Sequence, residues 1–217
     1  MIDTAKYKSK PKFFCIGRNK TGTTSIKKAF VNFGFSIGNQ RIAENLMDDY
    51  FVGNFEIIID YCKSAQFFQD VPFSYPNTYR YIDEAFPKSK FILTVRDSPE
   101  QWYNSLVRFH SKSFGLGSAP VLSDLKEIEY ISKGWVYNNL KRLHKLNVDD
   151  NPYDREMLIN HYNNYNNEIL DYFKDRPDDL LVLNVSDTNS YKKLAEFVGV
   201  KINENDSFPW ENKTDNL

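Results

Sequence analysis

Residues 12–34 join a short apolar run, a polar loop and an amphipathic segment, and this order strongly constrains the fold. The run at residues 12–17 is apolar between its ends and finishes in glycine, as expected of a buried parallel strand. After the loop, apolar residues recur at the helical spacing i, i+3, i+4 and i+7, at Ile26, Ala29, Phe30 and Phe33. Gly34 follows where a C-terminal cap belongs. The pattern predicts a strand, a loop and a helix.

The same alternation continues along the chain. Further apolar runs predict buried strands at residues 66–70, 90–96 and 179–186. Helical patterns predict helices near residues 54–64, 77–86, 99–110, 153–175 and 190–198. Strands that alternate with helices form a mostly parallel sheet with helices on both faces. A length of 217 residues suits one α/β domain, so we expect a single three-layer αβα domain over residues 1–217.

The stretch 112–152 departs from this alternation. It begins with Gly115 and Gly117, carries a helical pattern near residues 123–146 and ends at an Asn-Pro pair. We interpret it as an insertion or lid that shapes a substrate site.

Charge and composition limit the kind of site. Lys and Arg number 28 and Asp and Glu 29, which gives a net charge of −1. Bulk charge therefore does not indicate nucleic acid, and any anion site has to be built locally. The two cysteines, Cys15 and Cys62, are expected to be reduced core thiols. The three histidines lack metal-ligand spacing, so no metal site is expected.

Hydropathy indicates the compartment. The N-terminal residues 1–12 are polar and lysine-rich, and no long apolar region follows them. The sequence contains no apolar run of about 18 residues, the length that a membrane-spanning helix requires. We expect a cytoplasmic protein without a membrane span.

The loop at residues 17–25 reads Gly-Arg-Asn-Lys-Thr-Gly-Thr-Thr-Ser and has the chemistry of an anion site. A glycine turn between a strand and a helix offers backbone N–H groups and the positive end of the helix dipole. Gly22 allows close approach, and charge and hydroxyl groups come from Arg18, Lys20, Thr21, Thr23, Thr24 and Ser25. In a Walker A loop the lysine directly follows the last glycine, whereas Lys20 precedes Gly22. The alternative is an ordinary strand–helix turn with a solvated lysine.

A second element follows the strand at residues 90–96. Arg96 ends the strand, Pro99 opens a helix and Ser105 lies further along it. Arginine holds a phosphate dianion by paired hydrogen bonds. The alternative is a capping role for Asp97 or Ser98, with Arg96 in a surface ion pair.

Together these elements resemble the sulfotransferases that use 3′-phosphoadenosine-5′-phosphosulfate (PAPS), whose fold is similar to that of P-loop NTPases. Lys-Thr-Gly-Thr-Thr-Ser after the first strand is similar to the family's 5′-phosphosulfate loop, in which the lysine contacts the bridging oxygen and the sulfuryl group. The resemblance gives that role to Lys20. Arg96 and Ser105 resemble the 3′-phosphate motif, with Ser105 as the ninth residue after the arginine instead of the usual eighth. Ser98 accounts for the difference as a one-residue insertion.

The resemblance also suggests a base. Many sulfotransferases end a strand in His-Leu-Pro with histidine as the base, and other branches use a carboxylate. Here Asp70-Val71-Pro72 ends the 66–70 strand, so the resemblance implies that Asp70 takes the acceptor proton. The alternatives are that Asp70 caps the next helix or pairs with Arg80. His110 is the competing base.

The C-terminal stretch 208–214 resembles the segment that closes over the nucleotide in several sulfotransferase branches. The resemblance implies that Trp210 packs near the adenine and that Asn212 or Lys213 reaches the 3′-phosphate. It implies that the donor also contacts the phosphosulfate loop at Arg18, Asn19, Lys20, Thr21, Gly22, Thr23, Thr24 and Ser25.

The implied activity is transfer of a sulfuryl group from PAPS to a hydroxyl or amine, with adenosine 3′,5′-bisphosphate (PAP) as product and no metal. The acceptor, a carbohydrate among other hydroxyl compounds, cannot be read from the sequence, and neither can the oligomeric state. One rival is a P-loop nucleotide or small-molecule kinase, which should carry a Walker A lysine. A second rival is a non-catalytic module that binds the nucleotide without transfer.

Overall fold

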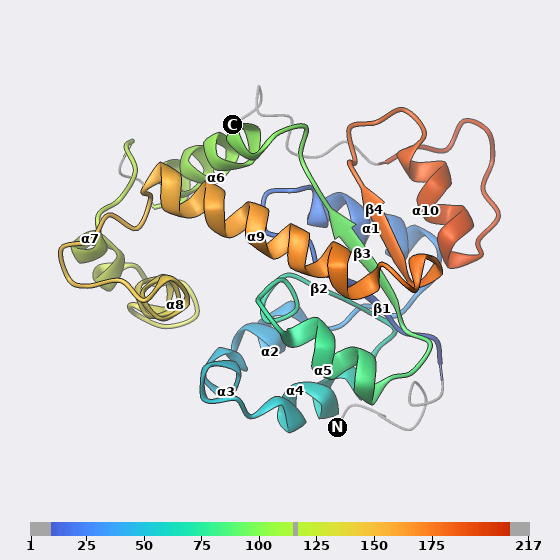
Figure 1. Ribbon diagram of the computed structural model, residues 1–217, viewed down its shortest axis with the longest axis horizontal. Helices are drawn as coiled ribbons and strands as arrows, with labels where there is room; N and C mark the ends of the chain where they lie inside the picture. The colour runs from blue at the N-terminus through green and yellow to red at the C-terminus, as the bar shows by residue number, and fades with distance from the viewer. Residues whose placement is uncertain (1–9, 115–116, 209–217) are drawn as a thin grey trace. The chain divides into compact units, whose positions relative to one another are not determined.

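The computed structural model describes residues 10–114 and 117–208 (Figure 1). These residues fall into two compact units. One runs to Arg96 and resumes at Asn166, and the other spans Asp97–Tyr165. The stretch 112–152 that we interpreted as an insertion lies within the second unit. The single domain expected over residues 1–217 stays a prediction.

The first unit is built on a four-stranded, all-parallel sheet, as expected. Its strands, in the spatial order β2-β1-β3-β4, are β1 (Phe13–Cys15), β2 (Phe67–Gln69), β3 (Lys90–Thr94) and β4 (Leu180–Leu183). In the centre of the sheet, Phe14 is in register with Phe68 on one side and Phe91 on the other. Because every pair is parallel, the carboxyl ends of the strands lie along one edge.

Helices flank both faces of this sheet, which gives the expected three-layer αβα architecture (Figure 1). The helices are α1 (Thr23–Asn32), α2 (Gln40–Glu44), α3 (Met47–Val52), α4 (Phe55–Tyr61), α5 (Thr78–Ala85), α9 (Arg155–Phe173, from Asn166 onward in this unit) and α10 (Ser190–Val198). Two 3₁₀ turns, η2 (Cys62–Ser64) and η3 (Pro177–Asp179), complete the described elements of the unit.

Side-chain alternation along β1 divides the core into two parts. Phe13 faces α1 and α10, where it joins an apolar cluster that includes Phe30 and Leu194. Phe14 points to the opposite face and stacks on Phe91, at a centroid distance of 5.6 Å. Both cysteines are buried free thiols, as expected.

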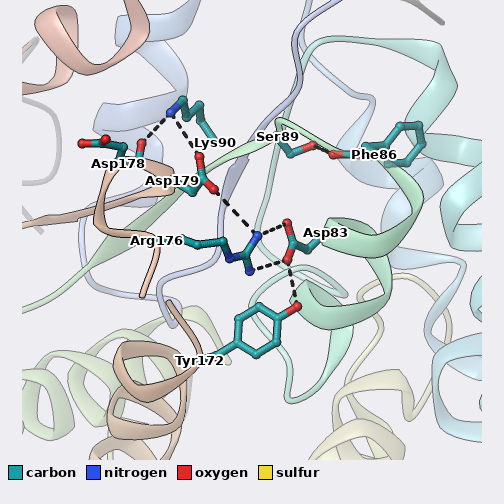
Figure 2. A network of polar contacts seen from close by, with 8 residues as sticks. All are labelled: Asp83, Phe86, Ser89, Lys90, Tyr172, Arg176, Asp178 and Asp179. Carbon is teal, nitrogen blue, oxygen red and sulfur yellow. Dashed lines mark hydrogen bonds and ion pairs between the residues drawn. The ribbon is translucent and has the colours of Figure 1, made fainter. Parts of the chain in front are cut away.

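A polar network joins the elements at the amino ends of β3 and β4 (Figure 2). The Arg176 guanidinium donates two hydrogen bonds to the Asp83 carboxylate at 2.6 and 3.2 Å, and the Tyr172 hydroxyl donates a third at 2.8 Å. Lys90 donates to Asp179 at 3.2 Å, and Asp179 lies 3.7 Å from Arg176. The network links α5 and α9 to the starts of both strands.

The second unit is helical, with α6 (Pro99–Ser113), α7 (Leu122–Glu127), α8 (Trp135–His144) and the first part of α9. Ser98 caps α6 by accepting from the Gln101 N–H at 3.1 Å, and Pro99 occupies the first turn. The unit has its own core, in which Trp102 stacks on Tyr162 at 4.6 Å.

The secondary structure differs from the expected pattern in three places. The single helix near residues 123–146 is two helices, because the chain becomes extended at Ile128 and resumes a helix only after Gly134, whose φ of 73° is left-handed. The helices α2 and α3 were not expected. The strand at 179–186 is shorter and lies at an edge of the sheet, and its Val182 is 43% exposed, whereas a buried strand was expected. No helix in the described part of the chain is long and apolar enough to cross a membrane.

Candidate active site

The candidate site lies where β1, β2 and β3 end. The loops that follow these strands carry Lys20, Asp70 and Arg96, respectively. The strand order changes direction at β1, because β2 pairs on one side of it and β3 on the other. In open α/β sheets, ligands bind at the carboxyl ends of the strands at such a switch point. The expected anion loop occupies this place.

Two glycines allow the loop to lie close against the sheet. A Cβ added to Gly17 would stand 2.0 Å from the Thr94 hydroxyl oxygen and 2.6 Å from its backbone. Gly22 has a φ of 98°, and a Cβ there would meet the Val185 side chain at 2.4 Å. The loop therefore packs directly on the ends of β3 and β4.

Threonine side chains divide between the inside and the outside of the loop. Thr21 is fully buried, donates to the Arg18 carbonyl oxygen at 2.5 Å and lies 2.5 Å from the Thr94 hydroxyl. These contacts brace the loop from within. Thr24 is exposed at the start of α1, and the cap position before it, Gly22, provides no side-chain cap. A helix start of this kind suits an anion.

Lys20 occupies a tight part of the loop. It is half-buried, its φ of 66° is left-handed, and its carbonyl oxygen accepts a 2.6 Å hydrogen bond from the Nε of Arg96. Burial and the neighbouring Arg96 charge lower the pKa of Lys20, and the Asp70 carboxylate opposes that shift. Two cations held together in this way form a local positive site on a chain with almost no net charge.

Asp70 stands directly after β2 with a φ of 60°. Its carboxylate accepts from the Val71 N–H at 2.9 Å, and its carbonyl oxygen accepts from the Ser74 N–H at 2.8 Å. Burial raises the pKa of Asp70, while the Val71 hydrogen bond and the charges of Arg18, Lys20 and Lys27 oppose that rise. Asp70 is thus a desolvated carboxylate among cations.

The structural alternatives for Asp70 do not match its contacts. The cap residue of α5 is Asn77. The Arg80 guanidinium packs over the Tyr79 and Tyr172 rings, at 5.2 and 4.7 Å from their centroids. Ser98, by contrast, does have the capping role considered for it.

Arg18 has a setting that the sequence did not reveal. Its side chain is 6% exposed, its NH1 donates to the Ser74 carbonyl oxygen at 2.6 Å, and its guanidinium carbon lies 5.0 Å from the centre of the Tyr75 ring. Arg18 therefore contacts the turn that follows Asp70. No sequence signal identified this contact, because it depends on which way the side chain leaves the loop.

The remaining predicted residues belong to the loop and the start of α1, to the second unit, or to the stretch beyond residue 208. Asn19 is half-buried in the loop, Thr23 is buried and Ser25 is half-buried. Ser105 belongs to α6 of the second unit, and so does His110, whose Nδ1 lies 2.7 Å from the Tyr153 hydroxyl. Trp210, Asn212 and Lys213 lie outside the described residues. The described ranges contain no group of three or more His, Cys, Asp or Glu side chains placed to hold a metal ion.

In a comparison with protein-family models, residues 12–217 match the model of a sulfotransferase domain. The chain belongs to the sulfotransferase family. Among curated proteins, none matches it. The matched range begins just before β1 and takes in the loop and all four strands of this sulfotransferase. The family's reaction is sulfuryl transfer, so the chain is a transferase.

Proposed function

We propose that this sulfotransferase takes its sulfuryl group from PAPS and transfers it to a hydroxyl or amine of the acceptor, releasing PAP. The observation that supports this most is the cluster of Lys20, Asp70 and Arg96 at the carboxyl edge of the sheet. Each of the three comes from a different strand end, and the Lys20 charge interacts with both of the others. Cations beside a helix start suit the anionic donor, and a carboxylate beside them suits a proton acceptor.

The donor is bound mainly by the loop and by Arg96. Lys20, the exposed start of α1 at Thr24 and Ser25, and the loop backbone around Asn19, Gly22 and Thr23 take the 5′-phosphosulfate. Thr21 supports them from inside the loop. Arg96 takes the 3′-phosphate and so selects this donor over ATP. Ser105, Trp210, Asn212 and Lys213 complete the proposed donor set.

Lys20 and Asp70 carry the transfer. The acceptor oxygen forms a bond to sulfur while the bond between sulfur and the bridging phosphate oxygen breaks. Lys20 stabilises the charge that grows on the bridging oxygen. Asp70 takes the acceptor proton, and the products are a sulfate ester and PAP. Because burial raises the pKa of Asp70, its carboxylate is a stronger base than an exposed aspartate.

For the acceptor, the proposal rests on residues 112–152. These residues follow neither the strand alternation nor the donor motifs, and we assign them to the acceptor side. A carbohydrate or another hydroxyl compound fits the general reaction. A screen of acceptors with sulfur-labelled PAPS would identify the class.

A calorimetric titration tests the donor first. PAP should bind the protein without added metal, and ATP with Mg²⁺ should bind much more weakly. Tight binding of ATP and no binding of PAP would favour the kinase alternative and end the PAPS proposal. Binding of PAP without transfer to any acceptor in the screen would favour the non-catalytic module.

A further inference from the structure

Arg18 is a buried cation that contacts protein on two sides. It lies in the loop after β1 and is 6% exposed. Burying a guanidinium costs free energy of folding unless fixed partners compensate its charge. Its NH1 donates to the Ser74 carbonyl oxygen at 2.6 Å, and its guanidinium lies 5.0 Å from the centre of the Tyr75 ring. Both partners follow Asp70 in the sequence.

The partners belong to a closed turn that begins at Asp70. The Ser74 N–H donates to the Asp70 carbonyl oxygen at 2.8 Å, and the Tyr75 N–H donates to the Pro72 carbonyl oxygen at 3.1 Å. Arg18 therefore holds the end of the turn whose first residue is the proposed base. The other side of the turn is bound from α2, where the Gln40 side chain donates to the Val71 carbonyl oxygen at 3.3 Å.

The charge of Arg18 also acts on Asp70. It lowers the pKa of that carboxyl against the larger effect of burial. The ionisable groups that interact with Asp70 come from β1, the loop, α1 and the turn, and they are Cys15, Arg18, Lys20, Lys27 and Tyr75. Lys20 is assigned to the sulfuryl group. Arg18 differs from it because its NH1 donates to the Ser74 carbonyl oxygen and its guanidinium lies over the Tyr75 ring, both in the turn.

We propose that Arg18 is a positioning residue, which holds the Asp70–Tyr75 turn against the phosphosulfate loop and places a positive charge near the Asp70 carboxylate, and that it is not a ligand of the donor. This inference rests on the proposed function of Asp70 as the base. It changes the role that the sequence resemblance suggested for Arg18. If Arg18 did bind PAP, removing its charged hydrogen bonds would lower the affinity of the protein for PAP by about 10- to 150-fold.

The test uses Arg18→Met, which keeps an unbranched apolar stem and removes the charge, with Arg155→Met as control. Arg155 is exposed and pairs with Glu100 at 3.1 Å in the second unit. Carboxyl ¹³C NMR titration follows Asp70 directly, with Asp70→Asn to assign its signal, and calorimetry gives the affinity for PAP. We expect Arg18→Met to raise the pKa of Asp70 and to shift the acid limb of the pH profile of kcat/KM to higher pH by the same amount. The affinity for PAP should stay within about tenfold of wild type. Arg155→Met should change none of these.

Either of two results would overturn the proposal: a loss of PAP affinity beyond about tenfold, or an unchanged pKa of Asp70. If Arg18→Met does not fold, Arg18→Lys replaces it. Lysine keeps the charge but lacks the planar guanidinium that holds the turn, so kcat should fall. The affinity for PAP and the pKa of Asp70 should be retained. Wild-type kcat in Arg18→Lys, or weakened PAP binding, would then refute the positioning role. Failure of the proposed function would be seen separately. In that case the wild-type protein would neither bind PAP nor transfer sulfuryl groups, and the NMR titration would still measure the effect of Arg18 on Asp70.

Discussion

Arg96 donates a 2.6 Å hydrogen bond from its Nε to the backbone carbonyl oxygen of Lys20. The residue proposed for the 3′-phosphate thus supports the backbone of the residue proposed for the sulfuryl group. A change at Arg96 should therefore affect the contacts to both the 3′-phosphate and the 5′-phosphosulfate of the donor.

Arg96→Gln should weaken PAP binding by about 10- to 150-fold, because a charged partner of the 3′-phosphate is lost. Adenosine 5′-monophosphate lacks that phosphate, so its affinity should fall much less. Calorimetry with both nucleotides measures the ratio of the two affinities. An unchanged preference for PAP would assign the 3′-phosphate to another residue.

Lys20→Ala should reduce kcat by roughly 10²- to 10³-fold, the loss typical when one stabilising donor is removed from a transition state. The matched control is Lys193→Ala on the exposed side of α10. Labelled PAPS measures turnover in both variants. Near-normal turnover of Lys20→Ala would remove this lysine from the mechanism.

Asp70→Asn should abolish most transfer and yet stabilise the fold. Because burial raises the pKa of Asp70, its protonated form favours the folded state, and that contribution is lost as pH rises through the raised pKa. Asparagine stays neutral, can still accept from the Val71 N–H and tolerates the left-handed φ of 60°. The Tm advantage of Asp70→Asn over wild type should therefore grow as pH rises from about 4, the ordinary pKa of an aspartate, through the raised pKa of Asp70. An advantage that is constant with pH would show that Asp70 carries no such penalty.

Gly17→Ala should lower the free energy of unfolding by about 1–3 kcal/mol, because the new methyl group would overlap the backbone of Thr94. Lys193→Ala is the control, since it truncates an exposed helical side chain on α10 and should leave stability nearly unchanged. Urea unfolding of the two variants measures the difference. Equal stabilities would mean that the loop can move away from β3 at little cost.

Asp83→Asn should cost about 1–3 kcal/mol of stability, because it weakens three hydrogen bonds to a carboxylate that is 10% exposed. Asp171→Asn removes an exposed pair with Lys174 and should change stability by at most about 0.5 kcal/mol. Thermal unfolding compares them. Transfer activity should survive both changes, since Figure 2 places Asp83 in the network at the amino ends of β3 and β4.

The alternation of the sequence was enough to predict the sheet and its main helices. The apolar runs are short but bounded by glycine or proline, and the buried positions of α9, such as Leu158 and Tyr162, are those that the helical spacing indicates. The helices α2 and α3 have only 5 and 6 residues, too few for a period of 3.6 to stand out. The edge position of β4 depends on strand order, which local sequence does not contain.

The positions of three candidate site residues could be predicted from the strand ends that carry them. Lys20, Asp70 and Arg96 each end or follow a strand, so parallel topology alone brings them to one edge. The direction of a long side chain is not set in this way. The sequence does not predict that Arg18 contacts the turn after β2 or that Thr21 contacts Thr94.

Both residues proposed for the chemistry, Lys20 and Asp70, have left-handed backbone conformations. Such a conformation costs a residue with a side chain roughly 1–2 kcal/mol, and glycine or asparagine adopts it more easily. A library selected only for heat resistance should therefore enrich glycine or asparagine at positions 20 and 70 and return stable, inactive proteins. Directed evolution of this chain would have to select for sulfuryl transfer in every round to keep these two side chains.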